Sequence, residues 1–134
     1  MKLIINTDGG ARGNPGPAAI GVVISDGAKS LKNLKEYIGE ATNNVAEYKA
    51  LILALKTAAS MGAQELLIRM DSELIVRQMQ GRYKMKEPAL KVLATEALSV
   101  IRSFKKVDFT HIRRELNKQA DKLVNEAIDE AMDK

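Results

Sequence analysis

The sequence predicts an α/β fold in which helices flank a five-stranded mixed sheet, with the elements in the order βββαβααβα. Before residue 43, apolar residues recur at the spacing of strands and turn-forming residues separate them. Beyond residue 43 the spacing becomes helical, and two further strand-like segments lie between helices. The chain has 134 residues, 46% of them hydrophobic. That length suffices for one core, so we expect residues 1–134 to form a single domain.

The first three strands are expected to form an antiparallel meander. A strand over residues 3–8 precedes a loop rich in glycine and proline over residues 9–17. A second strand is expected over residues 18–25, where Asp26-Gly27 then favours a hairpin turn. A third strand follows over about residues 31–39, with looser alternation.

The remaining elements alternate between helices and strands. We expect them at residues 43–61 (helix), 65–71 (strand), 73–79 (helix), 88–104 (helix), 107–112 (strand) and 117–131 (helix). Asn43 and Asn44 can cap the first helix, Gly62 favours its end, and Ser72 can cap the second. Pro88 is tolerated in the first turn of the third helix. Because helices connect the first, fourth and fifth strands, these strands should run parallel.

The composition excludes several classes of protein. The chain has no cysteine, which excludes disulfide frameworks, thiolate metal sites and cysteine nucleophiles. No apolar run approaches the roughly 20 residues that span a bilayer, and the N-terminal segment does not have the pattern of a signal peptide. We therefore expect a cytoplasmic protein that does not bind membranes, and we expect it to be a monomer.

Positive charge is concentrated in one segment. The formal net charge is +4, whereas residues 77–106 hold eight basic residues against two acidic ones. Clustered positive charge favours a polyanionic partner such as nucleic acid. A solvated helix face would explain the same cluster, so charge alone leaves both interpretations open.

Four acidic residues are placed where this fold would bring them together. Asp8 and Asp71 end strands that should be parallel neighbours, and sites in open α/β sheets lie at the carboxyl ends of strands. Glu47 and Asp121 lie beside the apolar stripes of their helices, where an unpaired charge is rarely buried. Carboxylates without cysteine favour Mg²⁺ or Mn²⁺, and two such ions can support phosphoryl displacement. Taken singly, Asp8 could be a turn residue and Asp71 the start of a helix.

Several short motifs follow one another along nearly the whole chain. They are Thr7-Asp8-Gly9, the run Gly-Asn-Pro-Gly-Pro at residues 13–17, Thr42-Asn43-Asn44 followed by Glu47, Asp71-Ser72, and Asn117 with Ala120-Asp121. In this order the sequence resembles type 1 ribonuclease H. The resemblance implies a ribonuclease H-like fold and hydrolysis of the RNA strand of RNA–DNA hybrids by two metal ions, leaving 3′-hydroxyl and 5′-phosphate ends. It also implies that Asp8, Glu47, Asp71 and Asp121 are the metal ligands.

The resemblance further implies a set of substrate-binding residues. These are Gly9, Gly10, Gly13, Asn14, Asn43, Asn44, Ser72, Glu73 and Asn117. Glycines let the backbone approach a nucleic-acid strand closely, and contacts with 2′-hydroxyl groups distinguish RNA from DNA. The glycine-rich segment could instead be a plain turn, although nine residues are long for a hairpin connection. Asn43 and Asn44 could be helix caps only.

One catalytic position has two candidates. Many type 1 ribonucleases H carry a mobile histidine near the fourth carboxylate, which is thought to help proton transfer or product release. His111 has the spacing of that histidine, but it falls inside the last expected strand, where a satisfied structural histidine is favoured. Arg114 is expected in the following loop, and the pair Arg114-Glu115 resembles that of a shorter family variant. We favour Arg114 over His111, and the assignment stays open.

Residues 81–87 correspond to a segment that binds the substrate in several relatives, and this segment is short here. Those relatives carry a basic helical protrusion rich in lysine and tryptophan, whereas residues 81–87 are Gly-Arg-Tyr-Lys-Met-Lys-Glu. Tyr83 could lie against a sugar or base while its neighbouring cations meet phosphates, or it could belong to a solvated loop. Fewer phosphate contacts predict weaker binding and a shallower salt dependence.

Two other functions stay open. A nucleic-acid-binding module of the same fold, without useful catalysis, would bind hybrids without cutting them. An Mg²⁺-dependent phosphohydrolase for small phosphate esters is permitted by the acids and glycines, but the chain lacks a nucleophile motif and a phosphate-binding loop. Whether double-stranded RNA is also a substrate is not decided by the sequence.

Overall fold

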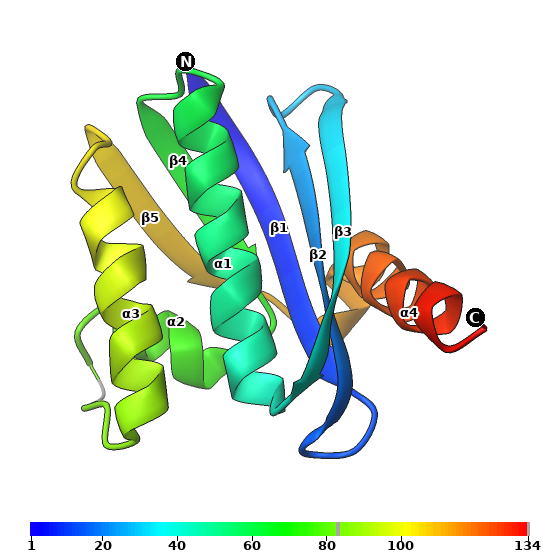
Figure 1. Ribbon diagram of the computed structural model, residues 1–134. Coiled ribbons are helices and arrows are strands. Elements are labelled where there is room, and N and C mark those ends of the chain that lie inside the picture. The colour runs from blue at the N-terminus through cyan, green and yellow to red at the C-terminus, as the bar shows by residue number, and fades with distance from the viewer. Residues whose placement is uncertain (83, 134) are drawn as a thin grey trace.

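The computed structural model describes residues 1–82 and 84–133 and has the predicted order of elements (Figure 1). These are β1 (Lys2–Ala11), β2 (Gly16–Ser25), β3 (Ser30–Ala41), α1 (Asn43–Ser60), β4 (Glu65–Met70), α2 (Glu73–Met79), α3 (Pro88–Ile101), β5 (Lys106–His111), the 3-10 turn η1 (Arg114–Leu116) and α4 (Lys118–Met132). Tyr83, for which the sequence suggested a nucleic-acid contact, lies outside the described residues. Within the described part of the chain, no helix combines the length and the apolar character needed to cross a bilayer.

The sheet has five strands in the order β3-β2-β1-β4-β5. β1 pairs antiparallel with β2, and β2 pairs antiparallel with β3, which confirms the meander. β1 and β4 run parallel, as do β4 and β5, which confirms the expectation from the helical crossovers. β1 is therefore the central strand, with an antiparallel neighbour on one side and a parallel neighbour on the other.

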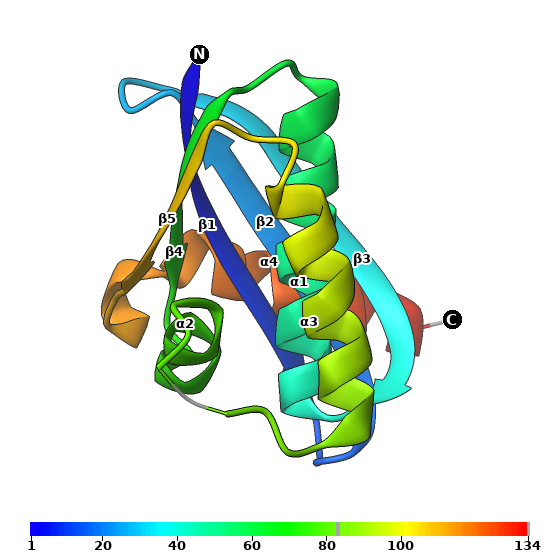
Figure 2. The same ribbon diagram turned by 90° about the vertical axis from the view of Figure 1, so that its left-hand side faces the viewer.

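Helices cover both faces of this sheet (Figures 1 and 2). α1 and α3 lie side by side over one face, where Leu51 and Leu55 of α1 are buried in one apolar cluster with Leu3 and Ile5 of β1. α4 packs on the other face, where Val124, Ala127 and Ile128 enclose a smaller cluster with Ala19 of β2. Burial of these apolar side chains is the main stabilising contribution to the fold. The parallel ladder of β1 and β4 ends at the pair Thr7 and Met70, which defines one edge of the sheet at the ends of these strands.

The first hairpin differs from the expectation. β1 does not end at residue 8 but continues to Ala11, and β2 begins at Gly16, so the connecting loop has only residues 12–15. The ladder pairs Gly9 with Ile20 and Gly10 with Ala19, which places both glycines inside the strand. Glycine has a low strand propensity, but pairing along a buried strand overrides that preference. The expected nine-residue loop is therefore wrong.

Two helix ends also differ from the expectation. The residue that caps α1 is Thr42, whose hydroxyl accepts a hydrogen bond from the Val45 backbone N–H at 3.2 Å, rather than Asn43 or Asn44. α3 ends at Ile101 instead of residue 104, since the N–H groups of the next residues turn back to nearer carbonyls: that of Ser103 donates to Val100. Such contacts tighten a last helical turn and end it.

Candidate active site

Three carboxylates converge at the edge of the sheet where the parallel ladder of β1 and β4 ends. Asp8, Glu47 and Asp71 each place one oxygen so that the three atoms lie within 4.8 Å of one another. The parallel ladder of β1 and β4 ends at the pair Thr7 and Met70, so Asp8 and Asp71 are the next residue of each strand. Asp71 directly follows β4, one residue beyond its expected place as the last residue of the strand, whereas Asp8 lies within β1 because that strand continues along β2. The parallel register still places the two acids side by side.

Glu47 reaches this edge because α1 lies very close to β1. A Cβ atom on Gly9 would lie 2.3 Å from the carbonyl carbon of Ala46 and 2.5 Å from the backbone nitrogen of Glu47. No side chain fits in that space, so Gly9 is required by the packing of the helix. The face of Gly9 that a side chain would occupy is covered by α1, whereas its backbone still lines the cavity described below, so its expected contact with the substrate stays a prediction.

Asp121 is brought to the site by a similar approach on the other face. A Cβ atom on Gly21 of β2 would lie 2.4 Å from the carbonyl oxygen of Ala120, so α4 also lies directly on the sheet. Asp121 then lies near enough to Asp8 for its negative charge to raise the pKa of Asp8. Four segments of the chain thus each bring one acid to the same cavity, and the assignment of all four as metal ligands stays a prediction.

Burial and nearby negative charge raise the pKa values of two of these acids. Burial raises the pKa of Asp8 to about 8, and the negative charges of Asp71 and Asp121 add to the effect. Burial also raises the pKa of Glu47 to about 7, although a hydrogen bond from Ser72 and the charge of Arg114 oppose the rise. Carboxylates that are this crowded are unfavourable together unless a proton or a cation lies between them.

This donor set fits a divalent cation. The ligand atoms are carboxylate oxygens only, which Mg²⁺ and Mn²⁺ prefer, and their separation allows a single ion to contact several of them. A cation would also remove the repulsion that raises the pKa of Asp8. The cluster therefore has the chemistry of a metal site rather than of a surface acidic patch.

The carboxylates lie in a cavity of about 530 Å³ between the two layers of helices. Backbone of β1 and its loop forms one wall, the start of α1 another, and α4 a third. The residues that line it are Asp8, Gly9, Gly10, Ala11, Arg12, Asn43, Asn44, Glu47, Asp71, Arg114, Asp121, Val124, Asn125 and Ile128. Two arginines, from different elements, thus face the same cavity as four acids.

Comparison with known proteins identifies the family. A family model described as reverse transcriptase-like matches residues 6–127. The solved structure of LC11-RNase H1 in complex with an RNA/DNA hybrid is 54% identical, covers 97% of this chain and 99% of that one, and superposes with a TM-score of 0.93. The chain belongs to the ribonuclease H family.

Curated relatives agree with this assignment. A bifunctional protein of Mycobacterium tuberculosis is 45% identical over 133 residues, which are 98% of this chain and 36% of that protein. Ribonuclease HI of Halobacterium salinarum is 42% identical over 125 residues, which are 92% of this chain and 63% of that protein. The chain therefore spans between about a third and less than two thirds of the length of these two relatives.

In this member of the ribonuclease H family, Arg114 lies beside the carboxylates and His111 does not. Arg114 lines the carboxylate cavity and lowers the pKa of Glu47. His111 is exposed at the end of β5 and lines a separate cavity with Arg77 and Gln80 of the α2 region. The expectation of a satisfied structural histidine is wrong, because β5 is an edge strand and leaves the ring in solvent. The geometry favours Arg114 as the residue beside the ribonuclease H carboxylates.

Asn117 is placed differently from the expectation. Its side chain is 1% exposed, donates a hydrogen bond to the Thr7 carbonyl at 2.9 Å and accepts one from the Asn6 side chain at 3.1 Å. Both ends of the amide are therefore used within the chain. Asn117 does not present its side chain to a substrate but fastens the start of α4 to β1, next to Asp8.

The other expected substrate residues fall into two groups, those that line the cavity and those outside its lining. Gly10, Asn43 and Asn44 line it, and Asn14 is on the exposed loop beside it, where its side-chain oxygen accepts a hydrogen bond from the Asn43 backbone N–H at 3.0 Å. Gly13 in the same loop has φ of +94°, a conformation that glycine adopts readily. Ser72 caps α2, with its oxygen accepting from the Ile75 N–H, and Glu73 begins that helix at the surface.

Sequence reasoning missed three residues of the site. Gly21 carries no motif, and only its contact with α4 reveals its role. Arg12 was counted as part of a glycine-rich loop, and Asn125 of the last helix was not singled out, yet both line the cavity. The spacing of Asn125, one turn after Asp121, could have placed it on the same helix face.

Proposed function

We propose that this chain hydrolyses the RNA strand of RNA–DNA hybrids and leaves 3′-hydroxyl and 5′-phosphate ends. The observation that carries the proposal is the group of three carboxylates within 4.8 Å in a member of the ribonuclease H family. Further support comes from the relative LC11-RNase H1, which was solved with an RNA/DNA hybrid. We propose that residues 1–134 act as one catalytic domain and as a monomer in the cytoplasm.

The proposed metal ligands are Asp8, Glu47, Asp71 and Asp121, and the proposed ions are two Mg²⁺ or Mn²⁺. Bound there, such ions supply an activated water and stabilise the leaving oxygen of an in-line displacement. The chain itself prepares the ligands: the Ser72 hydroxyl and the Arg114 charge both favour the ionised form of Glu47, which is the form that binds a cation.

The proposed catalytic role of Arg114 is electrostatic. Arg114 lines the carboxylate cavity, and its positive charge acts on Glu47. A cation at that place favours phosphate oxygens in the cavity and the extra negative charge of a phosphoryl transition state. His111 lines a different cavity and is not part of this proposal.

The proposed substrate contacts come from three segments around the cavity. The β1–β2 hairpin supplies Gly10, Gly13 and Asn14, the start of α1 supplies Asn43 and Asn44, and the start of α2 supplies Ser72 and Glu73. Backbone and amide groups of this kind can hydrogen-bond 2′-hydroxyl groups and so select RNA over DNA.

The experiment is a cleavage assay on an RNA–DNA hybrid labelled at one end of the RNA, with Mg²⁺, Mn²⁺ or EDTA. Asp71→Asn is the test variant, and Asp26→Asn, which changes an exposed acid in the β2–β3 turn, is the matched control. Double-stranded RNA and double-stranded DNA of the same sequence show whether the hybrid is selected. We expect metal-dependent cutting of RNA in the hybrid by the wild-type protein and the control only.

The outcomes separate the candidate functions. If folded Asp71→Asn protein cuts as fast as the wild-type protein, the carboxylate assignment is wrong. If the wild-type protein binds the hybrid but cuts it with neither metal, the chain is a binding module. Cutting of a small phosphate ester without any cutting of hybrids would favour the phosphohydrolase.

A further inference from the structure

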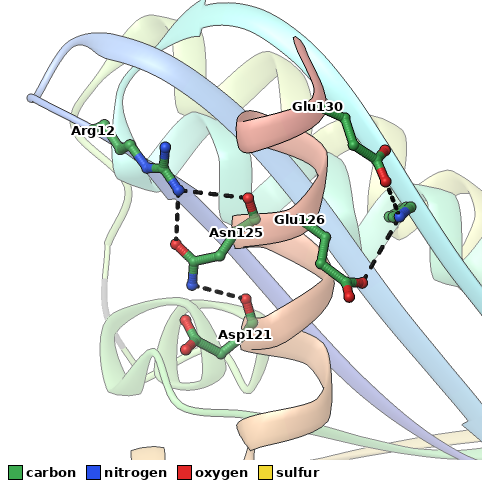
Figure 3. A network of polar contacts seen from close by, with 6 residues as sticks. Arg12, Asp121, Asn125, Glu126 and Glu130 are labelled. Carbon is green, nitrogen blue, oxygen red and sulfur yellow. Dashed lines mark hydrogen bonds and ion pairs between the residues drawn. The ribbon is translucent and has the colours of Figure 1, made fainter. Parts of the chain in front are cut away.

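Arg12 is an arginine on the wall of the carboxylate cavity whose side chain points away along α4. Its Nη1 atom lies 2.7 Å from the Asp129 carboxylate, and its Nη2 atom lies 3.4 Å from both the backbone and the side-chain oxygen of Asn125. Figure 3 shows the guanidinium reaching from the hairpin across to Asn125, whose amide in turn contacts the Asp121 carbonyl at 3.1 Å.

The hairpin does not need this contact to keep its place. On the other side of the loop, the Ala11 N–H donates to the Asn43 side chain at 2.9 Å and the Asn14 side chain accepts from the Asn43 N–H. Within the loop, the Arg12 N–H donates to the Pro17 carbonyl at 2.8 Å. The backbone of Arg12 is therefore fixed by main-chain and asparagine contacts, while its guanidinium is free to exchange partners.

The ion pair between Arg12 and Asp129 is a weak one. The Arg12 and Asp129 side chains are 44% and 61% exposed, and ion pairs between groups this exposed contribute little to stability. A phosphodiester offers the same guanidinium a charged, bidentate acceptor, for which arginine has a particular preference. A nucleic-acid strand lying in the cavity would bring such phosphates past the hairpin.

We propose that Arg12 is a substrate-binding residue that exchanges Asp129 for a backbone phosphate of the bound hybrid, an inference that rests on the proposed function. Asp129 then acts as a competitor that holds the guanidinium on α4 when no nucleic acid is bound. Removal of Arg12 weakens binding, and removal of the Asp129 charge strengthens it. If the ion pair of Arg12 and Asp129 only held the hairpin against α4, removal of either charge would break the pair. Hybrid binding would then become weaker, and not stronger, when the Asp129 charge is removed.

The test measures hybrid binding by fluorescence anisotropy over a series of salt concentrations, in Mg²⁺ and in the Asp71→Asn background, which prevents cutting. Arg12→Gln is compared with Lys29→Gln, which removes a positive charge from the turn at the opposite end of β2. Arg12→Gln is expected to bind roughly five- to tenfold more weakly at low salt and to lower the slope of log K against log salt by about one. Lys29→Gln should change neither by a comparable amount.

The Asp129 charge is tested in the same assay. Asp129→Asn is expected to bind roughly twofold more tightly or better, and this gain should vanish in the Arg12→Gln, Asp129→Asn double variant. In the active protein, Arg12→Gln should raise KM and leave kcat nearly unchanged, which a distorted cavity would not do.

Two results would overturn the inference while the proposed function stands. One is an Arg12→Gln protein that binds with the affinity and salt slope of Lys29→Gln. The other is an Asp129→Asn protein that binds more weakly than its parent. If the parent protein does not bind the hybrid at all, the proposed function fails first and the role of Arg12 fails with it.

Discussion

The backbone of α1 lies against Gly9 so closely that a methyl group on Gly9 would come within 2.3 Å of the Ala46 carbonyl carbon. This contact decides how deeply α1 sits on the sheet and therefore whether Glu47 reaches Asp8. Gly10, the next residue, has no such constraint: a Cβ atom there would meet only the Val124 side chain, at 3.6 Å. Two adjacent glycines of the same strand thus have different roles.

Gly9→Ala is expected to destabilise the fold by about 3 kcal/mol and to abolish cleavage, because backbone cannot yield as a side chain can. Gly10→Ala is the matched control and should change the free energy of unfolding by less than about 1 kcal/mol. Urea unfolding of both variants measures the difference. Equal stabilities would show that α1 can move away from β1 without loss.

Asn117→Ala is expected to lower the free energy of unfolding by roughly 1–3 kcal/mol, because it leaves the buried Thr7 carbonyl and the Asn6 amide without their partner. It should also slow cleavage by loosening the helix that carries Asp121. Asn125→Ala, on the exposed face of the same helix, is the stability control. A stable Asn117→Ala protein that had lost only hybrid affinity would instead support direct contact with the substrate.

The raised pKa values of Asp8 and Glu47 predict how stability depends on pH when no metal is bound. In the unfolded chain both groups ionise near pH 4, whereas in the folded chain they keep their protons up to about pH 8 and pH 7. The folded protein therefore binds more protons across this range, and its stability falls as pH rises from about 4 to 8.

Asp8→Asn removes the larger of these two effects. In EDTA, the variant should gain stability relative to the wild-type protein as pH rises, with a difference above about 1 kcal/mol at pH 8 and little difference at pH 4. Urea unfolding at several pH values gives this difference, from which titrating groups far from Asp8 cancel. A difference that does not grow with pH would contradict the burial of an ionisable Asp8.

A divalent metal ion should offset the loss of stability that the ionised carboxylates cause at high pH. Mg²⁺ binds the ionised carboxylates of the folded state, so it should raise the midpoint of thermal unfolding of the wild-type protein, and more at pH 8 than at pH 5. Asp71→Asn should show a much smaller rise, whereas Asp26→Asn should behave like the wild-type protein. A rise that is equal in all three proteins would place the metal elsewhere.

Arg114→Ala is expected to lower kcat on the order of 100-fold, the size typical of removing one fixed charge from a catalytic cavity. Since Arg114 lowers the pKa of Glu47, its loss should also move the acidic limb of the pH–rate profile towards higher pH. His111→Ala is the control and should retain both kcat and profile. The reverse pattern would restore His111 as the catalytic residue.

The sequence was sufficient for the order of elements and for the four acids, because hydrophobic periodicity and strand ends report local preferences and parallel strands share an edge. It was not sufficient where tertiary contacts override those preferences. Gly9 and Gly10 continue a strand only because β2 pairs with them. The burial of Asn117 and the contact of Gly21 with α4 depend on elements far apart in the chain. Such roles leave no trace in spacing or composition.

The four acids of the site come from β1, α1, the end of β4 and α4, so they span most of the chain from Asp8 to Asp121. During synthesis, a ribosome-bound chain can complete the meander and bury α1 long before the codon for Asp121 is translated. Until α4 docks on β2, the cluster lacks its fourth carboxylate and one wall of its cavity. Under the proposed function, a newly made chain is therefore expected to be inactive until α4 has emerged, so the onset of cleavage would report the docking of α4 on the sheet.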